Sequence, residues 1–405
     1  MDSTYIPYGV YWSTPYARWQ GSFAHLHSIE FGAHVAKAEL AKRGLAAGLF
    51  DYGILGTTVP QFRSFQGFNW LIALAGNPDI AGPTINQACA TSARILRMAD
   101  QETGDGAASC SLVIAADRTS NGPHVYYPNP EGPGAKGRAE DWVQDNFQDD
   151  PWARCAMINT AENVARKYQI PTSRQHEIVL RRYEQYAEAC ANGHAFHKRY
   201  MTLPFEVPDA RFIKTRTTLD GDEGVHNTTA EGLARLKPVL EGGTVTYGGQ
   251  THPADGNTAV VVATRDKARE LSRSPGIEIR IAGFGQARTE KAHMPMAPVP
   301  AAKRALADAG IGIKDIAAVK SHNPFVINDI VFAHETGYDV MAMNNYGCSL
   351  VWGHPQGPTG LRCIVELIEE LAMRGGGYGL FHGCAAGDSG MAVVIEVSDA
   401  GRRAS

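Results

Sequence analysis

The sequence predicts an α/β protein made of two similar halves with an inserted segment between them. Strand-like and helical runs alternate, and one short pattern occurs twice. Apolar runs rich in Val, Ile or Leu predict strands over residues 52–59, 111–116 and 259–264. Apolar residues at helical spacing predict helices over residues 29–44, 92–101 and 300–309. Because strands that alternate with helices form layered α/β domains, we expect this fold class.

The repeated pattern links the middle of the chain to its end. Residues 255–262 read as a turn of small residues followed by an apolar strand, and residues 387–394 repeat this pattern. The apolar runs over 112–116 and 378–382 also resemble each other, because each follows a predicted helix. Internal similarity of this kind indicates two related halves.

A segment of different character separates the two halves. Residues 120–241 are more polar, open with a loop over 123–150, and include a predicted long helix over 172–192 with apolar positions on one face. We expect this segment to be an insertion that packs over the first half.

The composition is that of an ordinary globular protein. The 405 residues include 20% charged side chains and carry a formal net charge of −4, so the basic stripe of a nucleic-acid-binding protein is not expected. Residues 1–19 lack the basic and apolar regions of a secretory signal, and no apolar run is long enough to span a bilayer. We therefore expect a cytoplasmic protein that binds neither nucleic acid nor membranes.

The seven cysteines are scattered and include no Cys-x-x-Cys pair. This spacing fits neither a disulfide framework nor a structural zinc site, so we expect free thiols and no bound metal. Four cysteines lie in runs that predict strands or helices and are expected to pack there: Cys110, Cys155, Cys190 and Cys363. His194 and His197 lie in a polar stretch and are expected to be solvated.

Two other cysteines stand in settings that suit chemistry. Cys89 immediately precedes a predicted helix, where the helix dipole and free N–H groups lower the pKa of a thiol from about 8.5 toward neutrality. Cys384 lies among Gly, Ala and Ser residues, whose backbone N–H groups can approach a ligand closely and form an oxyanion hole. The structural alternatives are a buried core cysteine for Cys89 and a tight turn with an unreactive thiol for Cys384.

Two histidines stand in equally distinctive settings. His354 lies between Gly353 and Pro355 in a rigid turn, which suits a group that orients a substrate or moves a proton. His322 follows a predicted strand over 316–320, at the end where α/β sheets bind their ligands. An ordinary loop histidine is the alternative for each. A nucleophile, two imidazoles and a second thiol are the groups needed to make or break a carbon–carbon bond beside a thioester.

The order and setting of four motifs resemble the thiolase family. These motifs are Cys-Ala-Thr-Ser over 89–92, His-Asn-Pro-Phe over 322–325, Gly-His-Pro over 353–355 and Cys-Ala-Ala-Gly over 384–387. Shorter similarities occur over 13–15, 160–163, 222–225 and 243–246, so the resemblance covers nearly the whole chain.

This resemblance implies a thiolase fold, in which two similar halves form a five-layered αβαβα core and an inserted loop domain helps to bind coenzyme A. The expected divisions are residues 1–119 and 242–272 for the N-terminal half, 120–241 for the loop domain and 273–405 for the C-terminal half. The enzyme would be a CoA-dependent acyltransferase that cleaves a 3-ketoacyl-CoA or forms one by Claisen condensation. Coenzyme A and the acyl-CoA would be its substrates, with no bound cofactor.

The resemblance also implies roles for the four motifs. The Cys89 thiolate would take up the acyl group, and Cys384 would move the proton at the nucleophilic carbon. His354 would activate Cys89 and, with a water positioned by His322, form one oxyanion hole. The backbone N–H groups of Cys89 and Ala386 would form a second. Two such sites are needed because thiolate attack and enolate formation each place negative charge on a thioester oxygen.

Thiolases also suggest partners for this chain. By resemblance we expect a homodimer or a homotetramer, since closed symmetric assemblies are common among such enzymes. Some thiolases with histidine in the second motif require a small partner protein. The resemblance therefore leaves open whether this chain binds a small accessory subunit with an OB fold and zinc.

Several positions depart from the usual thiolase pattern. His322 stands where many members have asparagine, which is closer to the sterol-carrier-type and archaeal-like branches. Ala156 replaces a usual histidine and Ala386 replaces a glycine, while Cys348 and Trp352 replace smaller or aliphatic residues. These departures favour a bulky or aromatic acyl chain, handled in a degradative pathway for fatty acids or aromatic compounds.

Further residues are candidates for substrate binding. By resemblance, Met157, Thr251 and Trp352 are expected to contact the acyl group or coenzyme A. An aromatic-rich loop over 124–127, together with Trp142 and Trp152, could line a pocket for a bulky acyl chain. Aromatic side chains in loops also serve as packing contacts, which is the alternative.

Three other functions compete with a thiolase. A β-ketoacyl synthase shares the fold and can use one cysteine with two histidines, but it gains its carbanion by losing carbon dioxide and needs no thiol base such as Cys384. A non-catalytic subunit or lipid-binding scaffold would retain the fold without turnover, and an acyl-CoA turnover assay separates it from an enzyme. A cysteine hydrolase leaves the second thiol unexplained.

Overall fold

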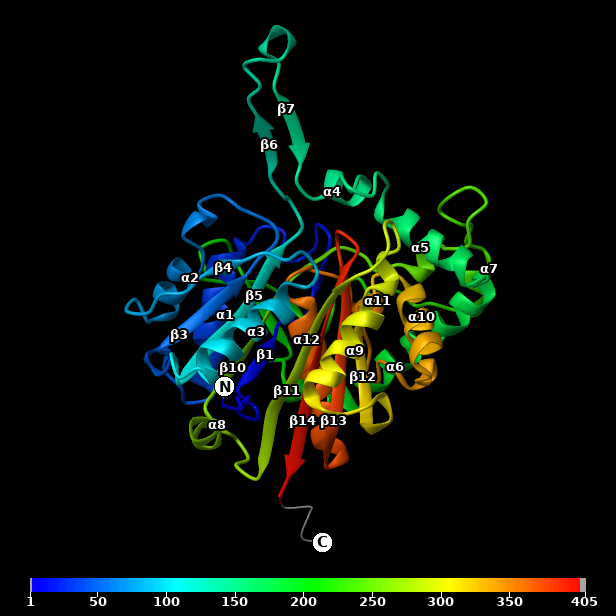
Figure 1. Ribbon diagram of the computed structural model, residues 1–405. Coiled ribbons are helices and arrows are strands. Elements are labelled where there is room, and N and C mark those ends of the chain that lie inside the picture. The colour runs from blue at the N-terminus through cyan, green and yellow to red at the C-terminus, as the bar shows by residue number, and fades with distance from the viewer. Residues whose placement is uncertain (1, 401–405) are drawn as a thin grey trace.

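The structure is a computed structural model that describes residues 2–400, in which two sheets stand side by side with helices on and between them (Figure 1). The first sheet has six strands in the order β1-β10-β5-β3-β4, with β2 paired to β10. Its strands are β1 Tyr11–Ser13, β2 Ala17–Arg18, β3 Tyr52–Gly56, β4 Thr84–Ile85, β5 Cys110–Arg118 and β10 Ala254–Ala263. Every residue of β10 is buried, as expected for a strand that is covered on both faces.

The second sheet has four strands in the order β11-β14-β13-β12. Its strands are β11 Ile277–Arg288, β12 Ile316–His322, β13 Gly376–Ala385 and β14 Ser389–Asp399. β12 and β13 run parallel, and in this pair His322 lies opposite Gly383. Because the carboxyl ends of parallel strands meet at one edge of a sheet, His322 and Cys384 lie at the same edge.

Helices complete five layers. Helix α3 (Thr91–Gly104) and helix α12 (Thr359–Arg374) contact each other and strands of both sheets, so they form the middle layer. Helices α1 (Ser28–Lys42) and α2 (Gly67–Ala75) contact the first sheet, and α9 (Pro298–Ala309) contacts the second. The predicted α/β class and its αβαβα layering are confirmed.

The segment between the halves adds small elements around this core. Its helices are α4 Gln144–Gln148, α5 Met157–Lys167, α6 Thr172–His194 and α7 Ala230–Ala234. Its strands form two hairpins, β6 His124–Tyr127 with β7 Arg138–Asp141, and β8 Phe205–Pro208 with β9 Thr215–Leu219. The β6–β7 hairpin projects from the body of the protein as a long arm (Figure 1). The remaining helices are α8 Arg265–Leu271, α10 Val326–Thr336 and α11 Ser349–Trp352.

Most predicted elements are present, with shifts that have local causes. The strand predicted over 52–59 ends at Gly56, because the next residues turn to donate hydrogen bonds to the buried Asp117 carboxylate. The turn predicted at Asp255 is instead part of β10, where Asp255 pairs with Arg118. The long helix predicted over 172–192 is α6, but its end leaves helical geometry at Ala191, Asn192 and Gly193.

The middle layer buries charged side chains in pairs. On α12, Arg362 makes a bidentate contact with Asp222, with distances of 2.6 and 2.7 Å to its two carboxylate oxygens. Lys320 of β12 lies 2.8 Å from Glu366 of the same helix. Buried charges need such partners because an unpaired charge in the interior is costly. These contacts tie α12 to the inserted segment and to the second sheet.

Two further properties concern the described chain as a whole. No helix within residues 2–400 is long and apolar enough to cross a membrane. The seven cysteines are free thiols, as expected.

Candidate active site

Cys89 lies on a tight turn between β4 and α3. The turn places Ala88 at a φ of 45°. Thr91 holds it closed, since its hydroxyl donates to the carbonyl of Ala88 at 2.7 Å and accepts from the N–H of Gln87 at 2.8 Å. The first turn of α3 therefore fixes the backbone that carries the thiol.

His354 faces Cys89 from the other half of the chain. Its Nε2 lies 3.2 Å from the Cys89 sulfur, and its Nδ1 lies 2.7 Å from Oγ1 of Thr359. The N–H of His354 donates to the carbonyl of His252 at 2.8 Å. The imidazole is thus fixed by the first residue of α12 on one side and reaches the thiol on the other.

Burial sets the protonation of this pair. It raises the pKa of the Cys89 thiol to about 12, opposed by the N–H groups of Ala386 and of Cys89 itself, which lower it. It lowers the pKa of His354 to about 3. The predicted lowering of the Cys89 pKa is therefore wrong for the free enzyme. The loss of water on burial destabilises the thiolate more than the hydrogen bonds from the nearby N–H groups stabilise it. The resting pair is a thiol beside a neutral imidazole.

His322 stacks on His354 at the edge of the second sheet. The ring centroids are 4.1 Å apart with 27° between the planes. One ring nitrogen of each histidine and the Cys89 sulfur lie within 4.8 Å of one another. His322 Nδ1 is 3.1 Å from Oγ of Ser349, while its buried Nε2 has no hydrogen-bond partner among residues 2–400. This nitrogen is available to a ligand beside Cys89.

Cys384 completes the group at the end of β13. Its side chain is buried, and Asn328 of α10 donates to its sulfur at 3.2 Å. Burial raises the pKa of Cys384 far above its ordinary value, and charge on Cys89 raises it further. The two thiols are therefore close enough to interact electrostatically. The structure brings together Cys89, His322, His354 and Cys384, and it directs the N–H of Ala386 to Cys89.

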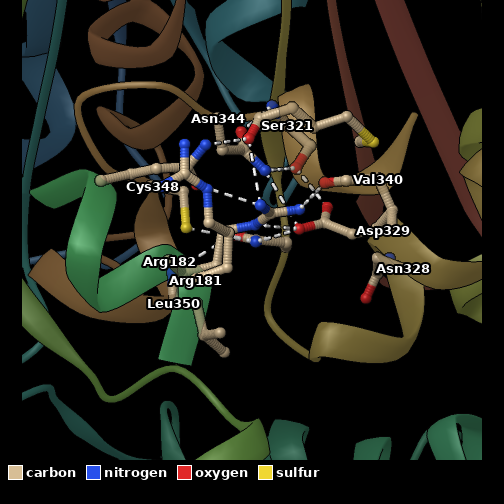
Figure 2. A network of polar contacts seen from close by, with 12 residues as sticks. Arg181, Arg182, Ser321, Asn328, Asp329, Val340, Asn344, Cys348 and Leu350 are labelled. Atoms are coloured by element: carbon tan, nitrogen blue, oxygen red, sulfur yellow. Dashed lines mark hydrogen bonds and ion pairs between the residues drawn. The ribbon is translucent and has the colours of Figure 1, made fainter. Parts of the chain in front are cut away.

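A network of polar contacts joins Asp329, Arg182, Ser321 and Asn344 (Figure 2). Asp329 pairs with Arg182 at 2.9 Å and accepts hydrogen bonds from Ser321, Asn323 and Asn344. Both charged side chains of the pair are fully buried. The network thus fixes the residues on either side of His322.

The network reaches the His322 ring through Ser349. Asn323 places its Oδ1 3.0 Å from the Ser349 hydroxyl, and its own N–H donates to the same hydroxyl at 3.1 Å. Because that hydroxyl also contacts His322 Nδ1, the orientation of the imidazole depends on contacts that begin at Asp329.

Comparison with known proteins identifies the family. Residues 12–266 match the family described as "Thiolase, N-terminal domain", and residues 277–397 match "Thiolase, C-terminal domain". The chain belongs to the thiolase family. It is therefore a CoA-dependent acyltransferase of the acetyl-CoA acetyltransferase or 3-ketoacyl-CoA thiolase type, acting on acyl-CoA.

Individual relatives are similar over nearly their full length. The chain is 30% identical over 397 residues to an acetyl-CoA acetyltransferase of Pseudomonas aeruginosa, covering 94% of this chain and 96% of that protein. It is 29% identical over 391 residues to a 3-ketoacyl-CoA thiolase of Bacillus subtilis, covering 93% and 95%. The crystal structure of human mitochondrial 3-ketoacyl-CoA thiolase has a TM-score of 0.88 and 25% identity, covering 98% of this chain and 99% of that one. A structure of the human enzyme in complex with CoA has a TM-score of 0.87.

The three residues expected to bind substrate in this thiolase have different surroundings. Met157 begins α5 and packs against the apolar cluster that contains Cys384. Both polar groups of Thr251 are bonded to backbone carbonyls. Its N–H donates to the carbonyl of Pro324, and its hydroxyl donates to the carbonyl of Ser349. Trp352 is fully buried, with the Arg362 guanidinium 4.3 Å from its ring centroid. Met157 therefore shares an apolar cluster with Cys384, and Thr251 bonds to the residue that contacts His322.

The aromatic residues proposed to line an acyl pocket lie on and beside the projecting hairpin. Tyr126 and Tyr127 lie on the projecting β6–β7 hairpin, where they are 64% and 44% exposed (Figure 1). Trp142 donates its ring N–H to the carbonyl of Thr58 at 2.9 Å, and Trp152 is exposed beside Lys291. Tyr126 and Tyr127 are thus exposed on the hairpin of the single chain, and a pocket role for Trp142 and Trp152 stays a prediction.

Sequence reasoning missed the residues that hold the reactive groups. Ser349 and Asn328 contact His322 and Cys384, but both lie in segments without a distinctive pattern. Thr359 lies within the segment that follows Gly-His-Pro, yet only the fold reveals its contact with His354. Asp117 accepts the N–H of Gly357 at 2.9 Å and so anchors the turn after His354. The sequence feature that could have pointed to Asp117 is an acidic residue near the end of an apolar strand.

Proposed function

We propose that this thiolase transfers its acyl group through an acyl-enzyme on Cys89, with His354 as the base that activates the thiol. The observation that carries the proposal is the 3.2 Å contact between His354 Nε2 and the Cys89 sulfur, on which the Ala386 N–H also converges. A neutral imidazole accepts a proton, and Thr359 holds the opposite ring nitrogen.

In the direction of cleavage, His354 takes the proton of Cys89 as the sulfur attacks the 3-keto carbon of a 3-ketoacyl-CoA. The bond between carbons 2 and 3 then breaks, and its electron pair leaves with acetyl-CoA as an enolate. Cys384 donates its proton to carbon 2 of this enolate, which releases acetyl-CoA. The thiol of a second coenzyme A attacks the acyl-Cys89 thioester and releases the shortened acyl-CoA, with the protons returning to the two thiols.

Negative charge on oxygen develops twice in this sequence, so two donor sites are needed. We assign the site for the enolate oxygen to His354 Nε2 and to a water held by His322 Nε2. The stacked rings and the unpartnered His322 nitrogen support this assignment. The backbone N–H groups of Cys89 and Ala386 would serve the oxygen of the tetrahedral intermediate on Cys89.

We further propose an acyl chain bulkier than acetoacetyl, in a degradative pathway. Ala156 supports this, because it precedes Met157 at the start of α5 and its side chain ends at Cβ. Met157 in turn packs with the cluster around Cys384. Trp352 contributes through packing, since its ring lies in the core. A larger apolar cavity gains about 0.8 kcal/mol for each buried methylene, so a few carbons shift specificity by tens of fold.

The remaining assignments follow from family resemblance. We propose that residues 120–241 form the loop domain that helps to bind coenzyme A, between the halves formed by residues 1–119 with 242–272 and by residues 273–405. We also propose a cytoplasmic homodimer or homotetramer. His322 in the second motif favours the sterol-carrier-type or archaeal-like branch and leaves a small accessory subunit with an OB fold and zinc as a possible partner.

The main alternative is a decarboxylating condensing enzyme of the β-ketoacyl synthase type. Such an enzyme needs no thiol for proton transfer at carbon 2. Cys384 argues against it, because this thiol is buried beside Cys89 and is held by Asn328.

A thiolysis screen tests the proposal. Purified enzyme is given coenzyme A with short, long and aromatic 3-ketoacyl-CoAs, and kcat/KM is measured for each. We expect cleavage of at least one bulky substrate with kcat/KM tens of fold above that for acetoacetyl-CoA. A kcat/KM for acetoacetyl-CoA equal to or above all others would refute the substrate assignment. Turnover of malonyl-thioesters with loss of carbon dioxide, and no thiolysis, would support the alternative.

A further inference from the structure

A second group of thiol and imidazole side chains lies at the end of α6, outside the catalytic residues. One ligand atom from each of Cys190, His194 and His197 lies within 4.8 Å of the others. His197 is 1% exposed, so the prediction of a solvated histidine is wrong, and Cys190 and His194 are half-buried. The cause is the fold of the chain, which turns this polar stretch back onto the core.

The backbone is shaped so that the three side chains meet. Helix α6 breaks after Cys190, and Asn192, Gly193 and His194 follow with φ values of 52°, 65° and 63°. Left-handed backbone is uncommon for residues other than glycine, above all in succession. It reverses the chain within one turn and returns His194 and His197 to the side of Cys190.

The distances suit a tetrahedral metal ion. His194 Nδ1 and His197 Nδ1 are 3.2 Å apart. With zinc–nitrogen bonds of about 2.0–2.1 Å, two nitrogen ligands of one tetrahedral zinc ion stand about 3.3 Å apart, and nitrogen and sulfur ligands about 3.6 Å apart. The nitrogens are already at this spacing, and the thiol, which lies within 4.8 Å of them, needs to move by about 1.2 Å at most.

We propose that Cys190, His194 and His197 bind one zinc ion. Two imidazole nitrogens and one thiolate form a borderline-soft donor set that suits zinc better than magnesium or calcium. Three protein ligands leave a fourth tetrahedral position for a water or an exogenous ligand. The spacing Cys-x3-His-x2-His escaped the sequence analysis because it spans the end of a helix rather than a compact Cys-x-x-Cys turn.

The surroundings support a built site rather than a chance cluster. The His197 ring is enclosed by Tyr186 and Tyr200, with centroids 5.4 and 6.2 Å away. A Cβ on Gly221 would lie 2.9 Å from Cε1 of His194, so the absence of a side chain there makes room for the second imidazole.

Asp222 lies near this group, but both of its carboxylate oxygens already accept hydrogen bonds, so it is not counted as a fourth ligand. Its Oδ1 accepts from Tyr16 N–H and Arg362, and its Oδ2 accepts from Tyr186 and Arg362. The fourth ligand is therefore expected from solvent, since Cys190 and His194 are only half-buried.

The test must separate this site from the catalytic residues. Cys89, His322 and His354 are also a thiol with two imidazoles within 4.8 Å, and could bind zinc as an inhibitor. The double variant Cys89→Ser/His354→Ala removes two of those donors. Zinc bound by that variant therefore belongs elsewhere.

The full-length Cys89→Ser/His354→Ala enzyme, freed of metal with a chelator, is titrated with zinc sulfate against a chromogenic chelator. We expect one equivalent to bind, and we expect Cys190→Ser or His194→Ala in this background to weaken binding at least tenfold. Cobalt(II) chloride should give a thiolate-to-cobalt charge-transfer band that Cys190→Ser abolishes. Cys155→Ser, which removes a half-buried thiol elsewhere, is the matched control and should change neither result.

A separate measurement guards against misfolded variants. In the otherwise wild-type enzyme, Cys190→Ser and His194→Ala should keep the thiolysis rate of the metal-free protein within about twofold. Absence of zinc binding in the double variant, or binding unchanged by Cys190→Ser and His194→Ala, would overturn the proposal. The cluster would then be a pair of hydrogen-bonded histidines beside an ordinary thiol.

Discussion

The imidazoles of His322 and His354 are stacked at 4.1 Å, although the two residues come from different elements of the second half. His354 contacts Cys89, whereas His322 leaves its Nε2 open. The stacking places one nitrogen that can activate the thiol beside one that can hold a water for the substrate oxygen. Under the proposed mechanism, the two histidines should therefore contribute differently to the rate.

We expect His322→Ala and His354→Ala each to lower kcat by roughly 100-fold or more, which is the usual cost of losing an oxyanion-hole donor. The loss should be larger for His354, because it also removes the base for Cys89. Steady-state thiolysis measures both. His293→Ala, a half-buried histidine beside Glu290, is the control and should stay near the wild-type rate. A near-normal rate for either site variant would contradict its catalytic role.

Cys89→Ser should abolish acyl transfer and acyl-enzyme formation while the fold persists, because a hydroxyl cannot replace the thiolate as nucleophile. Wild-type enzyme incubated with acyl-CoA should gain the mass of one acyl group, and peptide mapping should place it on Cys89. Cys155→Ser is the control and should be acylated like wild type. An adduct found only on another cysteine would refute the assignment.

The residues that meet in the candidate site could be predicted from sequence because short motifs carry them. Cys89, His322, His354 and Cys384 each lie in a turn or at a strand end, where glycine, proline or small residues mark the backbone. The strands and helices of the core were predictable for a similar reason, since burial on both faces leaves a run of apolar residues.

The supporting residues could not be predicted, because their roles depend on contacts between distant segments. Ser349 orients a residue 27 positions away, and Asn328 contacts a thiol 56 positions away. Asp117 accepts a hydrogen bond from Gly357, which lies 240 positions away in the sequence. The pKa of Cys89 was also beyond sequence reasoning, since a helix terminus is visible in the sequence but the depth of burial that outweighs it is not.

Cys384→Ala should separate the two chemical roles. The variant should still be acylated at Cys89, but it should not exchange the α-protons of bound acetyl-CoA for deuterium, because the group that carries the proton is gone. Mass spectrometry of acetyl-CoA recovered from deuterated buffer measures this exchange. Cys363→Ala, a buried thiol on α12, controls for the loss of a core cysteine. Undiminished exchange in Cys384→Ala would remove this thiol from the mechanism.

Ser349→Ala should act on His322 without touching the substrate. The change removes the hydroxyl at 3.1 Å from Nδ1, so the ring loses its fixed orientation. We expect kcat to fall by about tenfold with little change in KM, since the affected contact is made in the transition state. Ser349→Thr keeps the hydroxyl and should restore much of the rate. Equal losses in both variants, or a change in KM alone, would indicate a packing effect instead.

Asp329→Ala should destabilise the whole protein through the charge that it leaves behind. Arg182 is fully buried, and it would lose its carboxylate partner at 2.9 Å while Ser321, Asn323 and Asn344 lose an acceptor (Figure 2). Removing one member of a buried pair costs about 3–5 kcal/mol, so the urea midpoint should fall clearly. Glu177→Ala breaks a surface pair with Arg174 at 2.6 Å and is the matched control, with an expected cost of about 1 kcal/mol or less. Equal midpoints for the two variants would mean that the network around Asp329 contributes no more to stability than an exposed ion pair.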